Sequence, residues 1–158
     1  MTSEVTVSDV LLDILEATGI NCCFGVPGGQ TLPFYGAARE RGFHHVMMRD
    51  ERNTACAADA YARVSGLVGF CDATVGPGVT NLVSGLAEAY ASSIPVIALI
   101  ADIDTSLEHM RHRSIVGQAM DQRPMLESVT KWIGRIQKPE MIVDIMAHAF
   151  RVATTGRS

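Results

Sequence analysis

The sequence predicts an α/β domain in which helices cover both faces of a parallel sheet, a three-layer α/β/α arrangement. Apolar runs alternate four times with segments of helical periodicity over residues 6–100, and the connections between them are short. Alternation of this kind implies right-handed crossovers and a sheet whose two faces are both covered. We expect about six strands in a single domain over residues 1–158, because this length is enough to bury a proper core.

The first helix is expected from Thr6 to Thr18, where apolar residues recur at helical spacing. Thr6 or Ser8 can cap its start, and Gly19 stops it. The apolar residues from Cys22 to Val26 then predict a buried strand.

A loop at Pro27 to Gly29 leads into a second helix, which is expected from Leu32 to Arg41. A second strand follows at His45 to Met48. Glu51 then opens a helix of small residues that continues to Arg63, and a strand at Val68 to Thr74 comes next.

The second half of the chain is less regular than the first. A helix from Leu82 to Ser92 and a strand from Pro95 to Ile100 follow from the hydrophobic pattern. Residues 102–123 have no clear period, so we expect an extended or mobile segment there. A last strand is expected at Val129 to Ile136, and a closing helix at Pro139 to Thr154 with Pro139 in its first turn.

The composition excludes several classes of function. Hydrophobic residues make up 47% of the chain and charged residues 19%, a globular composition whose apolar excess suggests a partner surface. The net charge is -4, and the scattered basic residues form no nucleic-acid footprint. No apolar stretch reaches the roughly 18 residues of a membrane helix, and the N-terminus shows no secretion signal. We therefore expect a cytoplasmic protein that binds neither nucleic acid nor a membrane.

The cysteines and histidines do not have the spacing of a metal site. Two of the four cysteines are adjacent, and none belongs to a C-x-x-C pair. Cys22, Cys23 and Cys71 lie in apolar runs, where cysteine ordinarily serves as a small buried hydrophobe. On spacing, we expect no metal ligand in this chain.

Glu51 is the first candidate for chemistry. It lies where the apolar run that ends at Met48 meets a helix, and the carboxyl ends of strands are where ligands bind in open α/β sheets. A carboxylate at that junction meets a ligand with its backbone held on both sides. Taken alone, the position favours a simpler interpretation, an acidic residue placed in a first turn by the helix dipole.

A second junction, Gly76 to Asn81, lies about one βα unit further on. Its two glycines around Pro77 allow a ligand close to the backbone, and Thr80 and Asn81 supply polar groups and a possible N-cap. Taken alone, this loop and the one at Gly25 to Gly29 are also consistent with plain turn chemistry.

Four blocks follow one another along the chain, namely Phe24 to Gly29, Arg49 to Arg63, Gly76 to Asn81, and Pro95 to Ala98. A weaker fifth is Gln118 with Asp121, followed by Val129 to Lys131. Together the blocks resemble the pyrimidine-binding domain of thiamine diphosphate enzymes, and among these the N-terminal domain of the acetolactate synthase (acetohydroxyacid synthase) large-subunit group. The resemblance runs from about Val5 to Arg157, and the combination is far more specific than any one block.

The resemblance implies a thiamine diphosphate-binding fold that holds the pyrimidine end of the cofactor. The counterpart of Glu51 bonds N1′ of the aminopyrimidine ring, so Glu51 is implied as the catalytic carboxyl. A carboxyl that shares a proton with the ring stabilises the imino tautomer, whose exocyclic nitrogen deprotonates thiamine's reactive carbon. Gly28, Gly29 and Gln118 are implied near the substrate. The residues implied to bind the cofactor are Glu51, Pro27, Gly28, Gly76, Pro77, Gly78, Thr80 and Asn81.

Two departures separate this chain from the family pattern. Asp50 stands where the family commonly has a histidine before the glutamate, so a second acid either acts on the first or faces solvent. Gly117 to Ala119 replaces the family's Phe-Gln-Glu segment, so its aromatic wall and its acid are missing. The departures bear on substrate choice rather than on the fold.

Enzymes of this group anchor the diphosphate through Mg²⁺ on a second domain that carries a Gly-Asp-Gly motif. The sequence contains no Gly-Asp-Gly, and it stops where the family continues into its central domain. We therefore expect Mg²⁺ on a diphosphate-binding partner domain or subunit, without which this chain is inactive. The leading interpretation is the pyrimidine-binding half of an acetolactate synthase-like transferase or lyase, which decarboxylates a 2-keto acid and transfers the resulting carbanion.

Two alternatives stay open. One is a stand-alone alpha subunit of a split 2-keto acid decarboxylase, similar to sulfopyruvate or phosphonopyruvate decarboxylases. The other is a non-catalytic dimerisation module that keeps only the fold. All three interpretations imply self-association into a dimer or tetramer, because the family's pyrimidine domains pair across the cofactor site.

Overall fold

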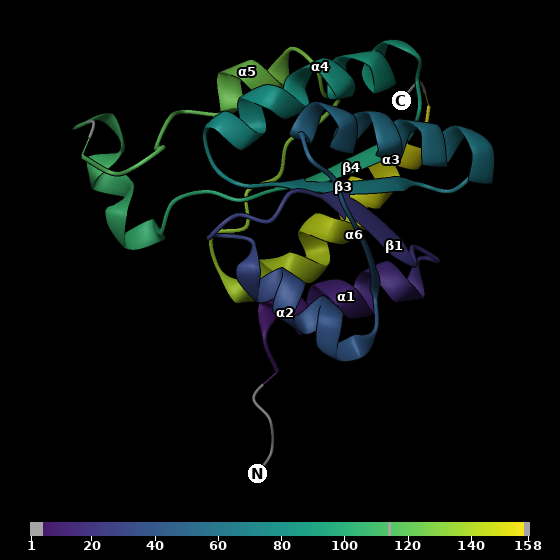
Figure 1. The fold of residues 1–158 in the computed structure, drawn as a ribbon, viewed down its shortest axis with the longest axis horizontal. Coiled ribbons are helices and arrows are strands. Elements are labelled where there is room, and N and C mark those ends of the chain that lie inside the picture. The colour runs from purple at the N-terminus through teal and green to yellow at the C-terminus, as the bar shows by residue number, and fades with distance from the viewer. Residues whose placement is uncertain (1–4, 114, 157–158) are drawn as a thin grey trace.

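The computed structural model describes residues 5–113 and 115–156, which form a parallel sheet between two layers of helices (Figure 1). The strands, in the spatial order β2-β1-β3-β4, are β1 (Cys22–Gly25), β2 (His44–Met47), β3 (Gly69–Ala73) and β4 (Val96–Ile100). Helices α1 (Val7–Ala17), α2 (Leu32–Arg41) and α6 (Ile142–Thr154) cover one face, and α3 (Glu51–Ser65), α4 (Pro77–Ala91) and α5 (Arg123–Glu127) cover the other. The predicted three-layer α/β/α fold is confirmed.

Each face of the sheet has its own apolar core. Leu12 and Leu15 of α1 pack with Phe70 of β3 on one side. Cys71, the next residue of β3, packs with Leu82 of α4 on the other side. Every residue of β3 is buried, as a central strand covered on both faces requires.

Local signals place the start of α1, the end of α2 and the proline before α6 as the sequence predicts. Thr6 caps α1 through its hydroxyl, which accepts from the backbone N–H of Asp9, while the carboxylate of Asp9 accepts from the backbone N–H of Thr6. Helix α2 occupies the expected residues and ends at Gly42, whose φ of 70° suits glycine. Helix α6 follows a single 3₁₀ turn, η2 (Pro139–Met141), which starts at the expected proline.

The prediction of about six strands is wrong, because the described residues form four. The segment from Val129 to Ile136 was expected as a strand, but it pairs with none of the four. Side chains anchor it instead: the ammonium of Lys131 donates to the carbonyl of Val152 across 2.9 Å, and Arg135 donates to Glu108 across 2.7 Å. These anchors hold the segment without a backbone ladder to β4.

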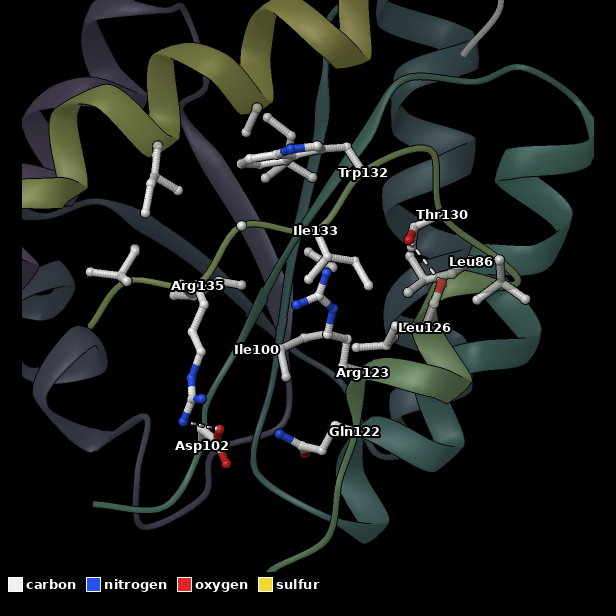
Figure 2. A pocket seen from close by; sticks show the side chains of 18 of the residues that line it. Leu86, Ile100, Asp102, Gln122, Arg123, Leu126, Thr130, Trp132, Ile133 and Arg135 are labelled. Atoms are coloured by element: carbon white, nitrogen blue, oxygen red, sulfur yellow. Dashed lines mark hydrogen bonds and ion pairs between the residues drawn. The ribbon is translucent and has the colours of Figure 1, made fainter. Parts of the chain in front are cut away.

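A cavity of about 690 Å³ lies between β4 and this segment (Figure 2). Ile100 and Leu126 line it from the sheet and α5, Trp132 and Ile133 from the segment. Neither Glu51 nor any residue from Gly76 to Asn81 lines this space. The cavity therefore lies where the segment from Val129 to Ile136 fails to pair with β4, and it is separate from the predicted site.

Within residues 102–113 and 115–123, the chain is more regular than the extended or mobile segment predicted for residues 102–123. It contains a 3₁₀ helix, η1 (Thr105–Arg113), whose Arg111 is buried. Arg111 donates to both Asp102 and Glu108 and to the carbonyl of Met120. Hydrogen bonds from Arg111 lower the pKa of Glu108 to about 2. These contacts join residues three to nine positions apart through one polar side chain, so no hydrophobic period predicts the 3₁₀ helix.

None of the helices in the described residues is long and apolar enough to cross a membrane.

Candidate functional site

Glu51 is the first residue of α3, and three residues separate it from the end of β2, so it lies at the carboxyl end of the sheet, as expected. Asp50 forms the N-cap of the same helix, and its carboxylate accepts from the backbone N–H of Arg52 across 2.9 Å. It also pairs with the Arg52 guanidinium, and these hydrogen bonds lower the Asp50 pKa to about 2. Asp50 is therefore committed to its own helix turn, and the carboxyl of Glu51 is available for other partners.

The first turn of α4 meets this carboxyl. The side-chain amide of Asn81 donates to Oε2 of Glu51 across 3.1 Å. Gly78 lies beside the other oxygen, because a Cβ added to Gly78 would come within 3.3 Å of Oε1 of Glu51. A larger residue at position 78 would press on the carboxylate, whereas glycine leaves one side of it open to a ligand.

Gly76 and Pro77 start α4 rather than forming a loop before it. The helix was predicted from Leu82 with Thr80 or Asn81 as its cap, but Gly76 is the N-cap and Pro77 the first helical residue. Proline suits this position because its missing N–H is one that a first turn leaves unpaired. Gly76 has a φ of 70°, and a Cβ there would overlap the carbonyl of Gln118. Because α4 begins at Pro77, the positive end of its dipole lies toward Glu51.

Gly28, in the loop after β1, lies against the carboxyl end of β3. A Cβ at Gly28 would overlap the side chain of Thr74, which follows β3. The buried hydroxyl of Thr31 closes the turn, accepting from the N–H of Gly28 and donating to its carbonyl, each across 3.1 Å. Thr74 in turn donates to Oε1 of Gln30 across 2.7 Å. The loops after β1 and β3 are thus in direct contact.

The structure does not join every predicted residue to this group. Thr80 is exposed, and its hydroxyl donates to the carbonyl of Pro77 in its own helix. Gly29 has no neighbour within 4 Å of a would-be Cβ. Gln118 contacts Gly76 through its backbone and has a φ of 63°, while its side chain is exposed. The group that does converge comprises Glu51, Gly78, Asn81, Gly28 and Gly76 with their neighbours.

Gln122 is a positioning residue that the sequence did not reveal. Its side chain is buried, accepting from the N–H of Gly76 across 2.9 Å and donating to the carbonyl of Ala101 across 3.2 Å. It thereby ties the start of α4 to the end of β4. Thr74 was missed in the same way, because each acts through a residue far away in the sequence.

Most of the chain matches a known protein family. Residues 5–125 match the family of the thiamine pyrophosphate enzyme, N-terminal TPP binding domain, where TPP is another name for thiamine diphosphate. The chain belongs to this family. The resemblance that the sequence predicted is confirmed.

Named relatives of this TPP-binding domain include two acetolactate synthases. A probable acetolactate synthase large subunit of Methanocaldococcus jannaschii is 42% identical over 95% of this chain and 25% of the relative. The acetolactate synthase isozyme 2 large subunit of Escherichia coli is 38% identical over 90% of this chain and 25% of the relative. A probable 2-ketoarginine decarboxylase of Pseudomonas aeruginosa is 33% identical over 97% of this chain and 27% of the relative. The chain thus spans about a quarter of the length of these relatives.

Proposed function

We propose that this TPP-binding domain holds the aminopyrimidine end of thiamine diphosphate in an enzyme that acts on 2-keto acids. The observation that carries the proposal is the carboxyl of Glu51 at the carboxyl end of the sheet, braced by Asn81 and open beside Gly78. When bound, the cofactor supplies a carbon acid that becomes the nucleophile for the keto group. A single carboxyl with one oxygen held and one free fits the ring nitrogen that such a cofactor presents.

Glu51 acts by sharing a proton with that ring nitrogen. Asn81 keeps the carboxyl in place through Oε2, so Oε1 is the oxygen that faces the ligand. Gly28 and Gly76 let the loops around Glu51 pack closely, because a Cβ at Gly28 would overlap Thr74 and a Cβ at Gly76 would overlap the carbonyl of Gln118, and we assign both glycines to the rim of the cofactor site. Pro27 and Pro77 are exposed beside them and complete the rim, and Thr80 contributes through the fold of α4. Gly28, Gly29 and Gln118 border the substrate.

The remainder of the reaction belongs to a diphosphate-binding partner. Mg²⁺ and the diphosphate are assigned to that domain or subunit, because the chain has no Gly-Asp-Gly motif. The named acetolactate synthases favour decarboxylation followed by carbanion transfer. The named 2-ketoarginine decarboxylase supports a second candidate, decarboxylation alone. The products formed from a 2-keto acid separate the two: coupled acetohydroxy acid in one case, free aldehyde in the other.

We further propose a homo-oligomer that works in the cytoplasm. Large apolar side chains are exposed on neighbouring helices, with Val64 of α3 90% exposed and Tyr90 of α4 45% exposed. Such side chains are commonly covered in an assembly. All four cysteines are free, as in a reducing compartment. Sedimentation velocity tests the assembly, and a monomer at every concentration contradicts it.

The deciding experiment is Glu51→Gln in the complete enzyme, with partner domain or subunit present. The variant keeps the shape of the side chain but cannot share a proton, so kcat falls about 10²- to 10⁴-fold. Asp144→Asn is the matched control, because Asp144 is also a first-turn acid but lies on α6. Full activity in Glu51→Gln contradicts the proposal. Failure of every diphosphate-binding partner to restore cofactor binding supports the non-catalytic module instead.

A further inference from the structure

Three side chains with metal-binding groups converge inside the sheet, on the face that α2 covers. Cys23 lies on β1, His45 on β2 and Asp72 on β3. One ligand atom of each lies within 4.8 Å of the others. Nε2 of His45 is 3.3 Å from Oδ2 of Asp72.

The strand register explains why they meet. Cys23 is paired with His45, and Asp72 is paired with Gly25, two residues beyond Cys23. Paired residues of parallel neighbours, and residues two apart on one strand, point to the same face of a sheet. A Cβ at Gly25 would overlap the carboxylate of Asp72, so glycine provides the space that the carboxylate fills.

The charges in this cluster are unbalanced. The side chain of Asp72 is fully buried, and in residues 5–113 and 115–156 no lysine or arginine forms an ion pair with it. The groups that face it are the imidazole of His45 from β2, the thiol of Cys23 from β1 and the hydroxyl of Tyr35 from α2. A buried carboxylate is costly without a compensating charge. A divalent cation with one carboxylate, one thiolate and a neutral imidazole gives a site of zero net charge.

We propose that Cys23, His45 and Asp72 bind a single Zn²⁺ ion. Thiolate, imidazole and carboxylate form a ligand set that suits zinc, and three protein ligands leave a fourth position open. The side chain of His45, 13% exposed on the edge strand β2, gives the ion a route of entry. As the zinc–sulfur bond forms, the thiol releases its proton to solvent.

Tyr35 supports this zinc site from outside. Its hydroxyl donates to Oδ1 of Asp72 across 2.8 Å, which leaves Oδ2, on the side of His45, for the metal. Its ring also lies against the imidazole, with centroids 4.1 Å apart. Partners that orient ligands in this way typically contribute about 10- to 100-fold to metal affinity.

The ion cross-links the three strands that lead into the candidate cofactor site. Beyond the cluster, β1 leads to Gly28, β2 to Glu51 and β3 to Gly76. Zinc is thus assigned a position beneath the site, separate from the Mg²⁺ assigned to the diphosphate. Because the zinc site does not depend on the proposed enzyme activity, metal binding itself is the readout.

Titration of the purified, metal-free protein with Co²⁺, a spectroscopic substitute for Zn²⁺, tests the proposal. We expect one equivalent to bind with a thiolate-to-cobalt charge-transfer band, and zinc to displace it. Cys23→Ala removes the band. It also weakens zinc binding by more than about 10-fold, because even the loss of a residue that only orients a ligand typically costs at least that much affinity. Cys22→Ala, the neighbouring buried cysteine on the opposite face of β1, leaves both unchanged.

Two further variants protect the test against misfolding. His45→Ala removes a ligand on the edge strand and leaves Cys23 in place, so cobalt binding weakens and the band falls at the same metal concentration. Tyr35→Phe keeps the band but weakens zinc binding about 10- to 100-fold. Circular dichroism confirms that each variant is folded. The proposal is overturned if the wild-type protein shows no thiolate–cobalt band, or if the band survives in folded Cys23→Ala; the cluster is then a metal-free hydrogen-bond network.

Discussion

The side-chain amide of Asn81 donates to Oε2 of Glu51 across 3.1 Å, which joins the N-terminal part of α4 to the first residue of α3 at the carboxyl end of the sheet. The two residues follow different strands and lie 30 positions apart in the sequence. This bond turns an ordinary first-turn acid into an oriented one, because a free glutamate would sample several rotamers. The other oxygen, Oε1, lies on the side of Gly78.

The first prediction concerns this bond. In the complete enzyme, Asn81→Ala frees the carboxyl of Glu51 to rotate, and we expect kcat/KM to fall about 10- to 100-fold, as for a lost hydrogen bond to a charged group. The loss should be smaller than that of Glu51→Gln, because the acid itself remains. Ser84→Ala, on an exposed position of α4 one turn further on, is the control. Equal steady-state kinetics for Asn81→Ala and Ser84→Ala would show that the bond does not position the acid.

The second prediction concerns pH and Asp50. Hydrogen bonds from Arg52 lower the Asp50 pKa from 3.8 to about 2 in the folded chain. A depressed pKa means that the ionised carboxylate stabilises the fold fully above its ordinary pKa, and that this contribution is lost as the pH falls toward 2. Asp50→Ala should therefore lower Tm at pH 7, and the difference from wild type should shrink below about pH 4. Calorimetry over this pH range measures it.

Asp50→Asn is the matched variant for that experiment. Asparagine is also a good N-cap, so it should keep much of the stability that Asp50→Ala loses. Because the asparagine side chain cannot ionise, the Tm of Asp50→Asn should lack the part of the pH dependence that comes from the Asp50 carboxylate. A difference between Asp50→Ala and wild type that stays constant down to pH 2 would contradict the assigned pKa.

The fold was predictable where local signals coincide. Helix α2 was placed correctly because a helical segment ends at Gly42, a residue that tolerates a φ of 70°. The start of α4 was misplaced because Gly76 to Gly78 has the composition of a turn, and only the structure shows Pro77 as a first helical residue. The 3₁₀ helix η1 depends on Arg111 reaching Asp102, a contact that no periodicity encodes.

Within the candidate site, the sequence predicts the catalytic acid well but not the residues that hold the surrounding loops in place. Glu51 stands out because a strand, an acid and a small-residue helix are adjacent in the sequence. Gln122 acts on Gly76 from 46 residues away, so its role depends on the fold. The same holds for Cys23, His45 and Asp72, whose proximity follows from strand register. Spacing along the chain therefore predicts no metal site, whereas pairing across the sheet suggests one.

The third prediction compares two adjacent glycines in the loop after β1. A Cβ at Gly28 would overlap Thr74, whereas a Cβ at Gly29 meets nothing within 4 Å. Neither glycine has a positive φ, so the contrast isolates close packing from backbone strain. Gly28→Ala should lower the free energy of unfolding by about 1–3 kcal/mol, as overpacking usually does. Gly29→Ala should be near wild type in urea denaturation, and equal losses in the two variants would refute the proposed contact.

The fourth prediction concerns Gln122, which bridges the N–H of Gly76 and the carbonyl of Ala101. Gln122→Leu keeps the volume of the side chain but leaves the buried N–H of Gly76 and the half-buried carbonyl of Ala101 without this partner. Each such group costs about 1–3 kcal/mol when it is left unpaired, so we expect a loss of that order in urea denaturation. Gln137→Leu, on an exposed position, is the control and should change stability by less than about 0.5 kcal/mol.

Gln122→Leu should also act on the cofactor site, because Gly76 begins the helix that carries Asn81. With its anchor gone, the start of α4 is expected to exchange its amide hydrogens faster, while β3 keeps its protection. Hydrogen exchange followed by mass spectrometry resolves the two segments. Slow exchange at Gly76 to Asn81 in a destabilised but folded variant would mean that other contacts hold the first turn, and that Gln122 serves overall stability rather than the geometry around Glu51.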